Sequence, residues 1–433
     1  MKKEISICWL RRDLRLNDQT ALYHSLRSNY PVLVIFVFDP EILDKLSDKE
    51  DKRVAFILQQ LKKINAELNK YGSGLMVLHE QIIPAFEKLN SEFTIKEVYT
   101  NHDYEPYAIT RDAKVDAYLS KSGIPFYTFK DQVIFEKSEI MKSDGTPYTV
   151  FTPYSRRWKE HFSKLPLQDL PSEKYLSNCL RIENQSIPEL EDIGFINPKF
   201  NLPSINIEED TIRSYHLTRN LPSVNGTSQV STHLRFGTIS VRQLVKLGIE
   251  WNEQWLNELI WREFFMMILF HYPHVVSNSF KKKYDQITWR NNEIEFHAWC
   301  SGQTGYPIVD AGMRQLNETG FMHNRIRMVV ASFLCKHLLI DWRWGEAYFA
   351  QKLMDYEQAS NIGGWQWAAS SGCDAVPYFR IFNPTSQQEK FDKDLKYIKQ
   401  WVKEFGTSAY PSPIVDHKEA REYTLNLFKS ALN

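Results

Sequence analysis

Four residues of the stretch WLNELIWREFF combine acidic, basic and aromatic side chains at helical spacing. Trp255, Glu258 and Trp261 recur at intervals of three, and Arg262 follows Glu258 at four. Residues three and four apart share one face of a helix, so indoles, a carboxylate and a guanidinium meet there. The carboxylate either forms an ion pair with Arg262 or accepts hydrogen bonds from a ligand, and the spacing leaves both open.

The stretch MHNRIRM adds a second polar cluster. Asn324 and Arg327 lie three apart on one helix face, and Arg325 lies about a quarter-turn to the side. Two arginines so close together suggest two anionic targets, or one buried carboxylate and one exposed phosphate. Asp355 is the favoured carboxylate partner and Glu357 the second choice, while a solvated basic face is the alternative.

Two further stretches have spacing that could serve a ligand. In NIGGWQWAASSG, Trp365 and Trp367 are two apart and must look into different surroundings if the segment is helical, although a core helix aromatic on two sides is the alternative. In GTSQVSTHLRFGTIS, hydroxyls and free backbone N–H groups around a turn could bind a phosphate, or could do no more than cap a helix.

The elements that must position these residues differ between the two ends of the chain. Short apolar runs alternate with amphipathic segments up to residue 130, which is typical of a doubly wound parallel sheet with a cleft at the carboxyl ends of its strands. The runs are Ile5–Trp9, Val32–Phe38, Leu75–His79, Glu97–Thr100 and Pro125–Phe129, and the clearest amphipathic segments are Asp51–Lys70 and Tyr104–Ser120.

Proline-rich, irregular sequence follows, and then almost continuous helical periodicity, for example over Val241–Leu247, Glu253–His271, Asn324–Leu339 and Gly345–Asp355. We therefore expect an α/β domain over residues 1–130, a connector over 131–205 and a helical domain over 206–433. Nine of the twelve tryptophans lie between Trp251 and Trp367, so the helical domain is expected to hold the chemistry.

Composition excludes several classes of protein. Lysine plus arginine equal aspartate plus glutamate at 53 each, which argues against a histone-like binder and leaves a local basic surface open. The five cysteines form no CxxC pair, so no metal site and no disulfide framework are expected. The first strand lacks a GxGxxG fingerprint. Without a signal peptide or a long apolar run, the protein is expected to be cytoplasmic, with no membrane association.

Several strings, in order along the chain, closely resemble the DNA photolyase and cryptochrome family, and within it the class I cyclobutane pyrimidine dimer photolyases. They are WLRRDLRLND, GTSQVSTHLRFGTIS, WLNELIWREF, GYPIVDAGMRQL, GFMHNRIRMVVASFL, DWRWGEAYF, NIGGWQWAAS, PYFRIFNPTSQQEKFD and YPSPIVDHKEAR. The resemblance implies a Rossmann-like α/β domain followed by an all-α domain that holds FAD. It also implies that the reduced, anionic FAD, excited by blue light, repairs a dimer flipped out of single- or double-stranded DNA.

The same resemblance assigns roles to individual residues. Those implied to bind the cofactor are Tyr215, Thr227, Ser228, Gln229, Val230, Ser231, Trp255, Glu258, Arg262, Asn324, Arg327, Asp355, Glu357 and Asn361. Those implied to act in catalysis are Glu258, Trp261, Asn324, Met328, Asn361 and Trp367. Arg219, Arg325 and Arg380 are implied to contact DNA phosphates, and Trp365, Trp342 and Trp289 to form an electron relay. Trp299 and Trp344 are expected to serve packing alone.

Departures from the family pattern qualify these expectations. Tyr107 and Ala108 stand where folate-binding relatives carry an Asn-Glu pair, which argues against a folate antenna and leaves a deazaflavin, a second flavin or no antenna open. Asn361 replaces the aspartate or cysteine of plant and animal cryptochromes and so favours repair over signalling. A cryptochrome-type blue-light receptor is the alternative function, and a monomer is expected.

Overall fold

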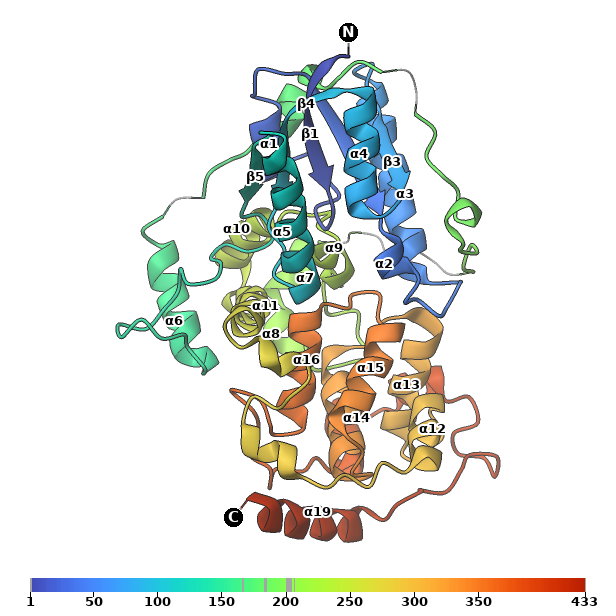
Figure 1. Ribbon diagram of the computed structural model, residues 1–433. Helices are drawn as coiled ribbons and strands as arrows, with labels where there is room; N and C mark the ends of the chain where they lie inside the picture. Colours follow the sequence, from blue (N-terminus) through green and yellow to red (C-terminus); the bar gives the residue numbers. More distant parts are fainter. Residues whose placement is uncertain (1, 166, 183–184, 200–204, 206, 433) are drawn as a thin grey trace. The chain divides into compact units, whose positions relative to one another are not determined.

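The N-terminal unit is built on a five-stranded parallel sheet with the order β3-β2-β1-β4-β5. The computed structural model (Figure 1) describes residues 2–165, 167–182, 185–199, 205 and 207–432. The strands are β1 (Glu4–Leu10), β2 (Val32–Phe38), β3 (Leu75–His79), β4 (Thr94–Asn101) and β5 (Phe126–Phe129). Each overlaps a strand expected from the sequence, and the predicted α/β class is confirmed.

Apolar side chains on both faces of the sheet explain why it forms. β2 is buried along its whole length, as expected of a strand inside a parallel sheet that is covered on both sides. Alternate residues of β1, such as Ile5, Ile7 and Trp9, pack with α4 (Ile82–Glu92) and α5 (Pro106–Lys121). The other helices among the described residues of this unit include α1 (Thr20–Ser25), α2 (Pro40–Leu43), α3 (Lys52–Asn69) and α9 (Ser231–Arg235).

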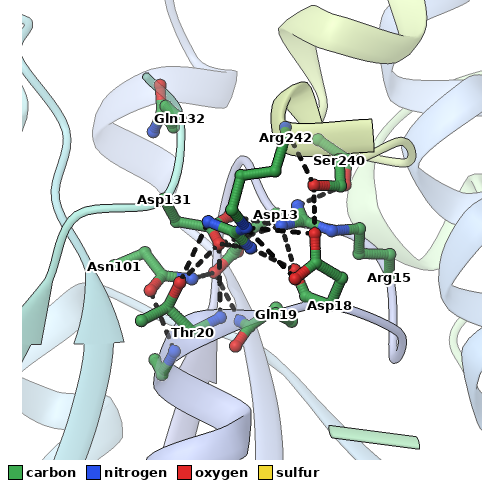
Figure 2. Close-up of polar contacts among 12 residues, drawn as sticks. Asp13, Arg15, Asp18, Gln19, Thr20, Asn101, Asp131, Gln132, Ser240 and Arg242 are labelled. Carbon is green, nitrogen blue, oxygen red and sulfur yellow. Dashed lines mark hydrogen bonds and ion pairs between the residues drawn. The ribbon is translucent and has the colours of Figure 1, made fainter. Parts of the chain in front are cut away.

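A buried polar network occupies the carboxyl end of β1, where the sequence suggested a cleft (Figure 2). Arg15 and Arg242, the latter on α10 (Val241–Trp251), both donate to Asp131, at 2.7 and 2.9 Å. Burial alone would raise the pKa of Asp131, but the two guanidinium groups outweigh it and hold that pKa below its usual value. Arg242 and Ser240 also bond Asp18, so the motif RRDLRLND ties the sheet to a distant part of the chain.

The second unit is helical and contains Lys137–His161, Asn206–Gln229 and Gly248–Asn433. Its major helices are α6 (Phe151–Phe162), α11 (Glu253–His271), α12 (Glu293–Ser301), α13 (Pro307–Thr319), α14 (Asn324–Lys336), α15 (Trp342–Lys352), α16 (Gln358–Ala368) and α19 (His417–Leu432). Shorter helices are α7 (Glu209–Arg213), α8 (Tyr215–Thr218), α17 (Pro384–Phe391) and α18 (Lys396–Trp401). Contacts join α16 to α11, α14 and α15, which brings the predicted site segments together.

Two differences from the sequence-based expectation have a clear local cause. The segment expected to be irregular contains α6, a helix of 12 residues, whose Pro153 sits in the first turn where its missing N–H costs no hydrogen bond. Helix α15 begins at Trp342 instead of Gly345 because Asp341 caps it, accepting a hydrogen bond from the backbone N–H of Arg343. Within the described residues, no helix is both long and apolar enough to cross a membrane.

Replacing Asp131 with Asn is expected to lower the free energy of unfolding by about 3 to 5 kcal/mol, because it leaves two buried guanidinium groups without their shared counter-charge. Urea denaturation at neutral pH measures the change. Since the pKa of Asp131 is lowered in the folded protein, its contribution is present above the unfolded pKa of about 3.9 and is lost as pH falls through the folded value.

Asp169→Asn is the matched control. This aspartate also pairs with a cation, Lys246 at 2.7 Å, but its side chain is 82% exposed, so the substitution should cost less than about 1 kcal/mol. Equal effects of the two substitutions would contradict the importance given to the buried network.

Candidate cofactor and substrate site

Helix α11 presents the first group of candidate residues. Asn252 caps the helix by accepting hydrogen bonds from the backbone N–H groups of Gln254 and Trp255, which fixes where the aromatic face begins. Trp255 is buried, and its indole N–H donates to the hydroxyl of Ser228 at 3.1 Å. The predicted phosphate segment and the start of α11 therefore contact each other directly.

The segment around Ser228 is held in a tight turn. Gln229 has a left-handed backbone with φ of 50°, and its amide lies 3.3 Å from Asn225 Oδ1. Thr218, at the end of α8, donates to the carbonyl of Gly226 at 2.9 Å. A Cβ on Gly226 would lie 2.4 Å from that threonine, so only glycine fits this approach.

Tyr215, half-buried, begins α8, and burial raises the pKa of its hydroxyl. Thr227 follows Gly226 within this turn, whereas Val230 and Ser231 belong to the N-terminal unit.

Glu258 pairs with an arginine that its helix spacing did not suggest. Its Oε1 lies 2.6 Å from Nη1 of Arg219, the C-cap residue directly after α8, and Arg262 pairs with Glu357 at 3.0 Å instead. Glu258 therefore does not pair with Arg262 of its own helix. Its partner, Arg219, comes from a different segment of the chain. Burial raises the pKa of Glu258, and Arg219 offsets that shift only in part.

Helix α14 carries the second group. Arg327 pairs with Asp355 at 2.8 Å, as the sequence predicted, and Asp355 Oδ1 is buried with no hydrogen-bond partner among the described residues. Asn324 is exposed at the first position of α14, and Met328, half-buried, lies one turn later. The unsatisfied carboxylate oxygen beside a cation fits a ligand that offers an N–H group, as the flavin ring of FAD does.

The two tryptophans of α16 lie in different surroundings. Trp365 is 2% exposed and packs over Gly345, where a Cβ would lie 2.1 Å from the indole. Trp367 is half-buried and lines an apolar pocket together with Trp261. Among the described residues, Glu258, Asn324 and Met328 do not line this pocket. Asn361, one turn before Trp365, donates from its amide to Glu346 Oε1 at 3.0 Å.

The three tryptophans of the expected relay differ in burial. Trp365 and Trp342 are buried, and Trp289 is half-buried against Phe428 at a ring distance of 6.1 Å. No ring contact joins the three to one another within the described part of the chain. Trp299 is edge-on to Trp365 at 6.0 Å, and its indole N–H donates to a backbone carbonyl, in agreement with a packing role.

The arginines expected at DNA lie within electrostatic reach of one another. Arg380 is exposed, and Arg325 donates to Asn220 Oδ1 at 2.7 Å and lies 4.4 Å from the ring of Phe391. Burial lowers the pKa of Arg325, and the positive charges of Arg219 and Arg380 lower it further. Arg219 is already paired with Glu258, and the positive charges of Arg325 and Arg380 favour an anionic partner.

Two features of the site region could not be found by spacing. Phe151 stacks on Trp261 from a segment expected to be irregular, and His323 caps α14 with a neutral imidazole, since burial lowers the pKa of that histidine to about 4. In the N-terminal unit, Tyr107 donates to Asp39 at 2.5 Å and Ala108 is buried. The prediction against a folate antenna stays a prediction.

Comparison with known proteins identifies the family. Residues 6–174 match the family model described as DNA photolyase, and residues 255–408 match the FAD binding domain of DNA photolyase. A deoxyribodipyrimidine photo-lyase of Alkalihalophilus pseudofirmus is 36% identical and aligns over 97% of both chains.

Two solved structures have the same architecture. A bacterial class III photolyase from Agrobacterium tumefaciens superposes with a TM-score of 0.88 at 31% identity, covering 100% of this chain and 98% of the other. A cryptochrome from Synechocystis superposes at 0.84 with 25% identity, covering 99% of each. The predicted FAD-binding domain and family are thus confirmed, and this chain belongs to the DNA photolyase family.

Proposed function

We propose that this protein uses blue light to split cyclobutane pyrimidine dimers in DNA, with reduced, anionic FAD as its cofactor. The observation that carries the proposal is that the indoles of Trp261 and Trp367, from two different helices, lie along one apolar pocket. A pyrimidine pulled out of the duplex gains stacking energy on aromatic side chains, which offsets part of the cost of unstacking it. The name of the Alkalihalophilus relative supports the same reaction.

Reduced FAD, when bound and excited by blue light, supplies the electron that opens the dimer and takes it back. The residues of the helical unit that would hold it are Tyr215, Thr227, Ser228, Gln229, Trp255, Glu258, Arg262, Asn324, Arg327, Asp355, Glu357 and Asn361. Arg327 would favour a negative charge on the flavin, and the orphaned Oδ1 of Asp355 would accept an N–H from it. Asn361 would face the flavin with a side-chain amide, which has no acidic proton to give to the reduced ring.

Glu258 would accept hydrogen bonds from the pyrimidine N–H groups. A carboxylate is the natural acceptor for these donors, and Arg219 keeps it oriented and partly neutralised at 2.6 Å until substrate arrives. Asn324 and Met328, one turn apart on α14, would complete the contact with the dimer. The proposed acceptor role requires the ionised form of Glu258.

Arg219, Arg325 and Arg380 would contact phosphates beside the lesion. Burial and the nearby charges of Arg219 and Arg380 lower the pKa of Arg325, and an anionic partner would offset the charge repulsion. Such contacts set the position of DNA without reading its sequence, and they weaken as salt rises.

Trp365, Trp342 and Trp289 would carry an electron inward from the surface when the bound flavin is oxidised. Trp365 and Trp342 are buried and Trp289 is half-buried, so the order of the three indoles leads from the interior toward the surface. A second candidate function, a blue-light receptor of the cryptochrome type, is favoured by the similarity to the Synechocystis cryptochrome and predicts FAD binding without dimer repair.

The purified protein is expected to show flavin absorption and, under blue light with a reductant, to restore a thymine-dimer oligonucleotide. Chromatography of the oligonucleotide before and after illumination measures repair, and a dark sample is the control. A flavin-loaded protein that leaves the dimer intact would contradict the proposal in favour of the receptor.

Replacing Glu258 with Gln is expected to weaken dimer binding in the dark by about ten- to a hundredfold, because a charge-assisted acceptor is lost. Burial raises the pKa of Glu258, so acid should protonate this carboxylate at a higher pH than an ordinary glutamate. Wild-type affinity for the dimer should fall over that pH range, while the variant shows no such step. Glu250→Gln, at an exposed position, should behave as wild type. An identical acid profile in both proteins would rule out the proposed acceptor.

Replacing Trp342 with Phe is expected to block light-driven reduction of the bound flavin, because phenylalanine is far harder to oxidise. Repair by chemically reduced protein should stay unchanged. Absorption spectra during illumination measure the first effect. The control is Trp344→Phe, which alters a neighbouring indole that packs on Phe296 at 5.2 Å. If Trp342→Phe abolished both activities, the relay assignment would be wrong.

A further inference from the structure

Contacts between α6 and α11 pair residues in antiparallel order, in a register that repeats every four residues. Each step of four residues back along α6 meets a step of four forward along α11, which is about one turn of each helix. The matched pairs are Lys159 with Glu253 at 2.5 Å, Ser155 with Asn257 at 3.3 Å, and Phe151 with Trp261. The register therefore brings the first residue of α6 onto Trp261.

Phe151 and Trp261 form a flat stack. Their ring centroids are 3.7 Å apart and their planes differ by 6°. Phe264 meets both rings edge-on, 6.0 Å from Phe151 and 5.6 Å from Trp261, which restricts rotation of the stacked pair. One face of the Trp261 indole is thereby covered.

The start of α6 is anchored beside the pocket. The backbone N–H of Phe151 donates to Asp374 Oδ2 at 3.0 Å, and Asp374 and Trp261 both line the pocket shared with Trp367. Among the described residues, Phe151 does not contribute to that lining. Its ring thus backs the indole from outside the pocket lining, whereas Phe265, 5.4 Å from Trp261 and tilted by 33°, belongs to that lining.

We infer that Phe151 is a positioning residue for lesion recognition: it holds the plane of Trp261 so that the indole face turned away from Phe151 receives a pyrimidine of the dimer. The inference rests on the proposed substrate role of Trp261. A half-buried tryptophan without a backing ring can rotate about its side-chain bonds, and fixing it would then oppose binding. Phe151 removes that cost before the substrate arrives.

Binding in the dark of a dimer-containing oligonucleotide, compared with its undamaged counterpart, tests the inference. Phe151→Ala should weaken binding to the dimer by about two- to tenfold, the range given by aromatic pair energies, and leave binding to undamaged DNA unchanged. Phe151→Tyr should restore the preference, whereas Phe151→Leu, which keeps bulk without a flat ring, should not. Should the alanine variant fail to fold, the leucine and tyrosine variants carry the test.

Ser155→Ala is the matched control, because it removes the neighbouring contact between α6 and α11 without touching Trp261. It should keep the dimer preference, and all variants should retain wild-type FAD content. Tighter dimer binding by Phe151→Ala would show that the ring occupies the substrate's place. If Phe151→Leu fully restored the preference for the dimer, or if Ser155→Ala lost that preference equally, Phe151 would serve only to pack α6 against α11. Each of these results would overturn the inference. A wild-type protein with no preference for the dimer would instead refute the proposed function.

Discussion

At the candidate site, a carboxylate partly withdrawn from water is held by an arginine from another segment, and this constraint organises the polar side of the site. Glu258 meets it through Arg219 at 2.6 Å, across two helices. Arg262 with Glu357 and Arg327 with Asp355 meet it at 3.0 and 2.8 Å. These three carboxylates are each paired with an arginine, which orients their polar atoms beside the aromatic side chains.

The aromatic residues are placed by close backbone approaches and by helix register. Gly345 lets Trp365 lie directly on α15, which turns that indole away from the pocket. Trp367, two residues on, is left for the pocket with Trp261. The separation of the two tryptophans follows from the geometry of one helix, because residues two apart cannot share a face.

Sequence reasoning succeeded where a contact is local or a pattern is long. The apolar runs of the five strands predicted the sheet, the spacing of α11 gave its bounds, and Asp355 was correctly chosen as the partner of Arg327. It failed where the deciding contact joins distant segments. Nothing local links Arg219 to Glu258, and the prolines of the presumed connector concealed α6 and the ring of Phe151. The polar network at the end of β1 also depends on such a contact, because Arg242 arrives there from far along the chain.

The central claim is that a dimer leaves the duplex to lie against Trp261 and Trp367, and 2-aminopurine placed opposite the dimer reports this directly. Its fluorescence rises when it loses its stacked neighbours. In the dark, the wild-type protein should raise the fluorescence of the dimer duplex and leave that of the matched undamaged duplex unchanged. Binding of the dimer duplex without any rise, or an equal rise with undamaged DNA, would contradict the account.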